Sequence, residues 1–193
     1  MEIFAYCGQS FEDATRRATG TEPLVCPPQL AATFEPQWLE GHDLLYFDFH
    51  GLPGDDCWFE ELPGTLPIRI PALNAEQIAE ADLGGAVVIA LTCYLGDEDS
   101  PMLDALLDAG ARYVIGGAGQ NWANRSGVTG AALLAREMIR HLADVEPPEA
   151  LTRAKRRVRL DLIANALRLN FGQVKAAKDT LGFRAFYRKD KIV

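Results

Sequence analysis

Continuous apolar runs, each bounded by polar or glycine-rich segments, predict the buried strands of this chain. The clearest runs cover residues 43–51 (DLLYFDFHG), 86–93 (AVVIALTC) and 111–117 (ARYVIGG). A strand that is apolar at successive positions is covered on both faces, as in a parallel sheet between layers of helices. A short run at 2–7 and an alternating pattern at 182–188 predict two more strands.

Segments with helical periodicity lie between these strands. The expected helices cover residues 10–19, 74–84, 100–110, 130–145 and 149–169. Ser10, Asn74 and Ser100 stand where N-cap residues are expected. The apolar stripe of the last helix is expected at Leu151, Ala154, Val158, Leu162, Ala166 and Leu169. Residues 20–36 are predicted to form a loop, and 52–71 a hairpin or an irregular excursion.

This alternation of strands and helices predicts an α/β fold with a mainly parallel central sheet flanked by helices. The length of 193 residues suits a single domain, 1–193. Residues 1–42, its N-terminal portion, carry the least regular part of the pattern. No apolar stretch is long enough to span a bilayer, and the first residues lack the basic start of a secretory signal. We therefore expect a cytoplasmic protein with no membrane partner.

Charge is divided unevenly along the chain. Residues 151–193 hold 12 Lys and Arg against 3 Asp and Glu, whereas residues 1–150 hold 7 against 24. A basic segment can bind nucleic acid. This one lacks interleaved glycines and aromatic stacking motifs, so we interpret it as a basic helix face against or near an acidic body. Nucleic acid is not an expected partner.

The metal-binding residue types show no ligand pattern. The cysteines Cys7, Cys26, Cys57 and Cys93 form no CxxC pair and no zinc spacing with histidine. The same holds for the group His42, Asp48, His50, Asp55 and Asp56. We expect no metal and no cofactor.

Two reactive side chains end predicted strands. His50 closes the run at 43–51 before Gly51, and Cys93 closes the run at 86–93. Functional groups of an open α/β sheet collect beyond the carboxyl ends of its strands, and an imidazole within reach can activate a thiol. The N–H groups of Gly51 and Cys93 could stabilise an oxyanion. Taken singly, His50 and Cys93 are each interpreted as an ordinary packing or loop residue. The hypothesis that they form a catalytic pair rests on their matching positions at the ends of two strands.

Other nucleophile schemes fit less well. A nucleophile elbow requires glycines where Leu91 and Leu95 stand, and a papain-like order requires a downstream histidine, for which only His141 exists. The segment 116–122 (GGAGQNW) lacks the features of a phosphate-binding loop. We expect it to form a cleft wall with Trp122 as an apolar surface for substrate, or else an ordinary strand exit with a packed tryptophan.

The order of these motifs resembles the caspase-like cysteine peptidases of clan CD, and most closely CHAT domains. An apolar block ending in His-Gly, a second ending in Cys, the run LLDAGARYVIGGAGQNW, the helix EALTRAKRRV and the segment GFRAFYR follow in that order over residues 43–190. The resemblance implies a caspase-like three-layer sandwich. It also implies endopeptidase activity through a thioester, with His50 as base, Cys93 as nucleophile and Gly51 in the oxyanion hole.

The chain also departs from that family. Thr92 stands where alanine is commoner, and Leu91 stands where some relatives carry an aspartate that selects basic substrates. Asp48, two residues before His50, could face the cleft and bind substrate, or face the other side of the strand. The expected partner is a protein or peptide substrate, and an activating protein partner fits the family. The alternative is a weakly active or inactive caspase-like/CHAT interaction module in a larger signalling or defence system.

Overall fold

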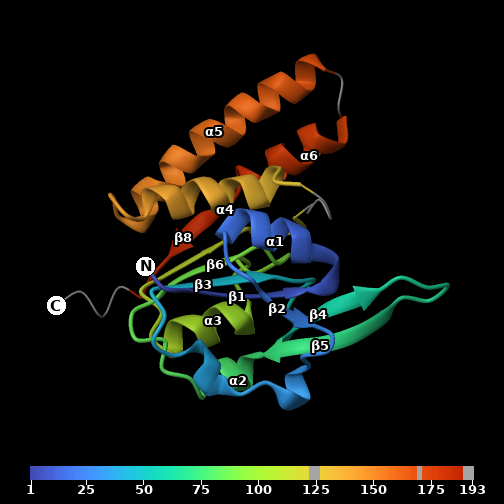
Figure 1. Cartoon of the computed structure of the whole chain (residues 1–193), viewed down its shortest axis with the longest axis vertical. Helices are drawn as coiled ribbons and strands as arrows, with labels where there is room; N and C mark the ends of the chain where they lie inside the picture. The colour runs from blue at the N-terminus through green and yellow to red at the C-terminus, as the bar shows by residue number, and fades with distance from the viewer. Residues whose placement is uncertain (122–126, 169–170, 189–193) are drawn as a thin grey trace.

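The computed structural model describes residues 1–121, 127–168 and 171–188, which form a six-stranded sheet between helices (Figure 1). The strand order is β2-β1-β3-β6-β7-β8. The strands are β1 (Ile3–Gly8), β2 (Leu24–Cys26), β3 (Leu44–Asp48), β6 (Val87–Ala90), β7 (Tyr113–Gly116) and β8 (Arg184–Phe186). Only β8 is antiparallel to its neighbour. The expected α/β fold with a mainly parallel sheet is therefore confirmed.

Helices cover both faces of this sheet. One face carries α2 (Ala75–Ala79) and α3 (Pro101–Asp108), and the other carries α1 (Glu12–Thr19) and α4 (Gly130–His141) (Figure 1). Outside α4 lie α5 (Pro147–Leu167) and α6 (Phe171–Thr180). Short 3-10 turns complete the chain: η1 (Gln9–Phe11), η2 (Ala31–Thr33) and η3 (Pro36–Leu39).

The proline-rich excursion is a separate two-stranded hairpin. It consists of β4 (Cys57–Leu62) and β5 (Ile68–Asn74), which pair antiparallel and extend from the edge of the body (Figure 1). The main-chain N–H and C=O groups of His50 bond to Phe59, at N–O distances of 3.0 and 3.1 Å. The hairpin is thereby attached to the segment that follows β3.

Several local predictions need correction. The segment 20–36 contains the edge strand β2, and the helix expected at 74–84 ends at Ala79. Ser10 does not cap α1; it lies in η1, where its N–H and hydroxyl both donate to the buried Glu60 carboxylate, at 2.8 and 2.9 Å. Asn74 and Ser100 do cap their helices.

The C-terminal helices also differ from the expectation. The helix expected at 149–169 begins at Pro147, and α6 was not predicted. Ala150, Leu151, Ala154 and Val158 are buried, but farther along Ala166 is exposed and Asn165 is buried in its place. Leu169 lies outside the described residues. The core stripe is therefore shorter than the pattern indicates.

Candidate active site

The two candidate catalytic residues follow adjacent parallel strands. β3 and β6 pair in register from Leu44 with Val87 to Phe47 with Ala90. The chain therefore leaves both strands at the same edge of the sheet, His50 two residues beyond β3 and Cys93 three residues beyond β6. This is the carboxyl edge, where open α/β sheets bind ligands.

The segments that leave these strands touch at Gly51. A Cβ atom placed on Gly51 would lie 2.7 Å from the carbonyl oxygen of Cys93 and 3.8 Å from its nitrogen. Such a distance is shorter than ordinary contact, so only glycine allows the two main chains to approach so closely. In the part of the chain that is described, neither the N–H of Gly51 nor that of Cys93 donates a hydrogen bond.

His50 and Cys93 also emerge on the same side of the sheet. Leu44 and Tyr46 of β3 contribute to the core beneath α1 and α4, and alternation assigns Asp48 and His50 to that side. The His50 ring lies 5.1 Å from the ring of Phe11, centroid to centroid. Along β6 and the residue after it, Val87, Ile89 and Leu91 belong to the same core, so the same alternation assigns Cys93 to that side.

The thiol of Cys93 is held by the backbone of Asn121. Sγ lies 3.3 Å from the Asn121 carbonyl oxygen, to which it donates, and 3.3 Å from the Asn121 nitrogen, from which it accepts. Burial raises the pKa of the thiol; the Asn121 bond opposes this rise and Asp48 adds to it. Cys93 is therefore protonated at neutral pH in this arrangement.

The glycine-rich segment 116–121 fixes the turn after Cys93. The amide of Asn121 donates to the Thr92 carbonyl at 2.9 Å, and the N–H of Tyr94 donates to the Gly119 carbonyl at 2.7 Å. A Cβ on Gly117 would lie 2.6 Å from the Asn121 amide. The glycines therefore allow two loops to pack, and this segment forms a wall around Cys93. Trp122, the expected apolar surface, lies outside the described residues.

The residue after Cys93 has a strained backbone. Tyr94 has φ of 62°, the one non-glycine residue with positive φ among those described. This left-handed conformation costs an L-residue about 1–2 kcal/mol and often occurs at functional sites. The left-handed backbone of Tyr94 is thus part of the turn that follows Cys93.

The expected substrate-binding residue Asp48 is buried, with 1% of its surface exposed. Burial raises its pKa well above the ordinary value, the charge of Glu60 adds to the rise, and the Tyr46 hydroxyl opposes it. Burial therefore favours the neutral form of this carboxyl. A substrate could reach it only after a rearrangement of the edge.

A small cavity lies at this edge among the described residues. A cavity of about 10 Å³ is lined by residues of both strand ends and of the hairpin, among them Gly51, Cys57, Trp58, Cys93 and Tyr94. That is room for about one water molecule.

Within the described residues, no group of three or more His, Cys, Asp and Glu side chains could hold a metal ion. No described helix is long and apolar enough to cross a membrane.

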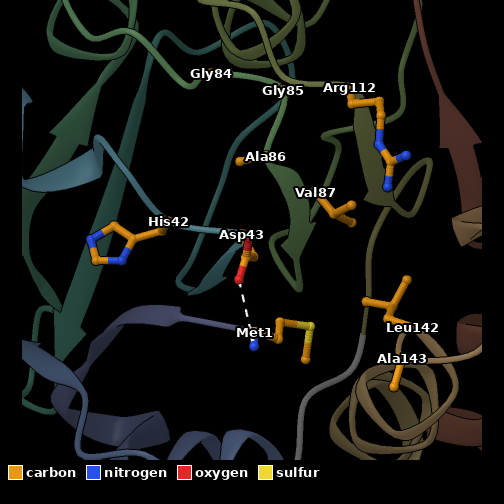
Figure 2. Close-up of a pocket in the computed structure, with 10 residues that line it drawn as sticks. All are labelled: Met1, His42, Asp43, Gly84, Gly85, Ala86, Val87, Arg112, Leu142 and Ala143. Carbon is orange, nitrogen blue, oxygen red and sulfur yellow. Dashed lines mark ion pairs between the residues drawn. The ribbon is translucent and has the colours of Figure 1, made fainter.

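A larger pocket of about 360 Å³ lies at the opposite edge of the sheet (Figure 2). Its residues precede the strands: Asp43 lies before β3, Ala86 before β6 and Arg112 before β7. The Met1 amino group pairs with Asp43 at 3.6 Å, and Arg112 with Glu146 at 3.3 Å. The charged groups of this pocket are thus paired, and it is separate from His50 and Cys93.

No protein-family model matches the chain, and no curated protein matches its sequence.

Three residues of the site were not predicted: Asn121, Tyr94 and Glu60. Asn121 contacts the thiol through main-chain atoms, which leave no side-chain pattern in a sequence. The glycines before Asn121 were the one available signal, because they indicate a close approach of two backbones.

Proposed function

We propose that this protein is a cysteine endopeptidase of the caspase-like class, with a caspase-like sandwich fold. The observation that carries the proposal is the contact of Gly51 with the Cys93 main chain, at the shared carboxyl edge of β3 and β6. A base and a thiol on the same side of neighbouring strand ends are what thiol-dependent acyl transfer requires.

In the proposed reaction, His50 accepts the proton of the Cys93 thiol, and the thiolate attacks the carbonyl carbon of a peptide bond. The oxyanion that forms accepts hydrogen bonds from the N–H groups of Gly51 and Cys93. Collapse of this intermediate breaks the C–N bond, and the imidazolium gives its proton to the leaving amine. Water, deprotonated by His50, then hydrolyses the thioester, releases the acid and restores the thiol.

The arrangement described here corresponds to a resting form in this proposal. The Cys93 thiol is protonated and donates to the Asn121 carbonyl, and the cavity beside it holds about one water molecule. Turnover then requires the 117–121 segment to move away from the thiol. A protein partner or the substrate itself could supply that step.

The test is labelling with a peptide acyloxymethyl ketone, followed by intact and peptide mass spectrometry. We expect Cys93 to be labelled before Cys7, Cys26 and Cys57, since recognition of the peptide directs the reagent to the site. Burial raises the pKa of Cys26 and Cys57 to about 11, so these thiols provide an internal reference. His50→Ala should slow the labelling about a hundredfold or more. Asn121→Ala removes the side-chain bond to the Thr92 carbonyl, which loosens the segment over the thiol, and should speed the labelling.

The alternative is an interaction module with little activity, favoured by the raised pKa of the Cys93 thiol and by the small cavity. An interaction module would give a different labelling result. Cys93 would be labelled no faster than Cys57, and His50→Ala would leave the labelling rate of Cys93 unchanged. That pair of results would exclude the peptidase proposal.

A further inference from the structure

The helix α5 carries a second apolar stripe, opposite to the stripe that faces the core. Leu160, Ile163 and Leu167 are 59%, 57% and 81% exposed. They follow one another at spacings of three and four residues, so they share one face of the helix. On the other side of the helix, Leu151 and Val158 are buried against α4 and the sheet. Hydrophobic side chains of this size on one exposed line indicate an interaction surface.

The same face is strongly basic. Arg156, Arg157 and Arg159 belong to the turns just before and beside the stripe, and all three are exposed. Among the described residues, none of the three forms an ion pair, whereas Arg153 is paired with Glu149 and Arg188 with Asp108. We call Leu160, Ile163, Leu167 and these three arginines the α5 face.

We propose that the α5 face binds an acidic amphipathic helix of another protein. The spacing of its three apolar residues matches alternate a and d positions of a coiled-coil seam, and the arginines Arg157 and Arg159 then occupy flanking e and g positions. A partner helix with leucine or isoleucine on its seam and glutamate or aspartate beside it would cover the stripe and neutralise the guanidinium groups.

Charge argues against a second copy of this chain as the occupant. An isologous contact through the α5 face would bring Arg156, Arg157 and Arg159 of each copy toward those of the other, and Asp161 is the one acid of α5 beside these three arginines. Like charges in such a contact oppose association.

The width of the stripe argues against a membrane surface. A helix that lies in a bilayer interface presents a broad apolar face, whereas an a/d seam is narrow. On α5 the positions beside the stripe are small or charged: Ala164, Ala166 and Arg159. A narrow seam with flanking arginines fits one helix of opposite charge. The position of α5 at the outer edge of the molecule leaves room for it (Figure 1).

The test uses a synthetic helical peptide with Leu at a and d and Glu at e and g, labelled with a fluorophore and titrated with the full chain. A peptide with Lys in place of Glu is the matched control peptide. We expect the acidic peptide to bind and the basic one not to. Leu160→Ser with Leu167→Ser should weaken binding about tenfold or more, and Arg159→Ala should reduce its salt dependence.

Leu66→Ser is the control variant, because Leu66 is 82% exposed but lies in the β4–β5 hairpin. It should leave peptide binding unchanged. The proposal fails if the acidic peptide does not bind, or if it binds the double variant as well as the original chain. It also fails if vesicles containing phosphatidylserine sediment the chain through Leu160 and Leu167, or if sedimentation velocity shows a dimer that Leu160→Ser disperses.

Discussion

At the scale of single residues, the carboxyl of Asp48 couples stability to pH. Its pKa is raised well above the ordinary value of 3.8, mainly because the group is buried. The folded protein therefore keeps this proton at pH values where the unfolded chain has lost it. This contribution to stability is therefore complete at acid pH and declines as pH rises above the pKa of the unfolded chain.

Asp48→Asn should remove that pH dependence. We expect the free energy of unfolding of the variant to rise relative to that of the original chain. The difference should grow by up to about 1.4 kcal/mol per pH unit above about pH 4, until the pKa of the folded state is reached. Urea unfolding across this range measures the difference. Asp99→Asn, at an exposed site after Cys93, is the control and should show no such gain. A difference that is constant with pH would contradict the assignment of a neutral Asp48.

The backbone strain at Tyr94 is a second effect at this scale. Tyr94→Gly and Tyr94→Ala remove the same aromatic ring, but only glycine adopts φ of 62° without cost. The glycine variant should therefore be more stable than the alanine variant by about 1 kcal/mol. Chemical unfolding of the pair measures this difference, and equal stabilities would show that the left-handed backbone at Tyr94 carries no strain.

At the scale of elements, the contact between the segments after β3 and β6 defines the site. Gly51→Ala would place a methyl group 2.7 Å from the Cys93 carbonyl oxygen, so one of the segments must move. We expect a loss of about 2 kcal/mol in the free energy of unfolding and slower labelling of Cys93. Gly172→Ala in α6 is the matched control: a Cβ there meets no atom within 4 Å. It should be neutral or slightly stabilising.

The same scale explains which elements the sequence could predict. The central strands were predicted because runs such as 43–51 and 86–93 are apolar at nearly every position. The edge strand β2 has three residues and follows a polar stretch, so it leaves little pattern. The helix α6 was missed because its buried positions are small or polar, Ala176, Ala177 and Thr180.

One error came from a polar residue in the core. The stripe of α5 was expected to include Ala166, but Asn165 is buried instead. Its amide donates to the Asp161 carbonyl oxygen and to Asp161 Oδ2, both at 2.9 Å. A buried polar group is tolerated when it is hydrogen-bonded. Hydropathy alone therefore placed the stripe one residue too far along the chain.

At the scale of the whole molecule, apolar contacts outnumber direct ion pairs between the C-terminal helices and the body in the described structure. The sequence suggested a basic face against an acidic body, but Arg188 with Asp108 is the one ion pair in the described structure that joins residues after 150 to those before 147. Apolar packing joins α5 to α4 through residues such as Leu151, Ala154 and Val158.

Two substitutions separate these contributions. Val158→Ala removes a fully buried side chain and should cost about 2 kcal/mol. Arg188→Ala breaks a pair in which both side chains are about half exposed, and should cost less than about 1 kcal/mol. Thermal unfolding in low and high salt measures both. If Arg188→Ala cost more stability than Val158→Ala, and if that cost disappeared in high salt, charge would be the main contribution that holds the C-terminal helices on the body.

The position of Phe186 sets an order for assembly during synthesis. A Cβ on Gly96 would lie 2.8 Å from the Phe186 ring, so strand β8 supports the loop that follows Cys93. The ribosome makes Gly96 long before Phe186, because the helices α3, α4, α5 and α6 are translated between them. Until β8 emerges and pairs with β7, the turn around Cys93 lacks this support. The nascent chain can therefore carry an ordered β3–β6 pair while the Cys93 thiol is still unplaced, and the candidate site is completed among the last steps of folding.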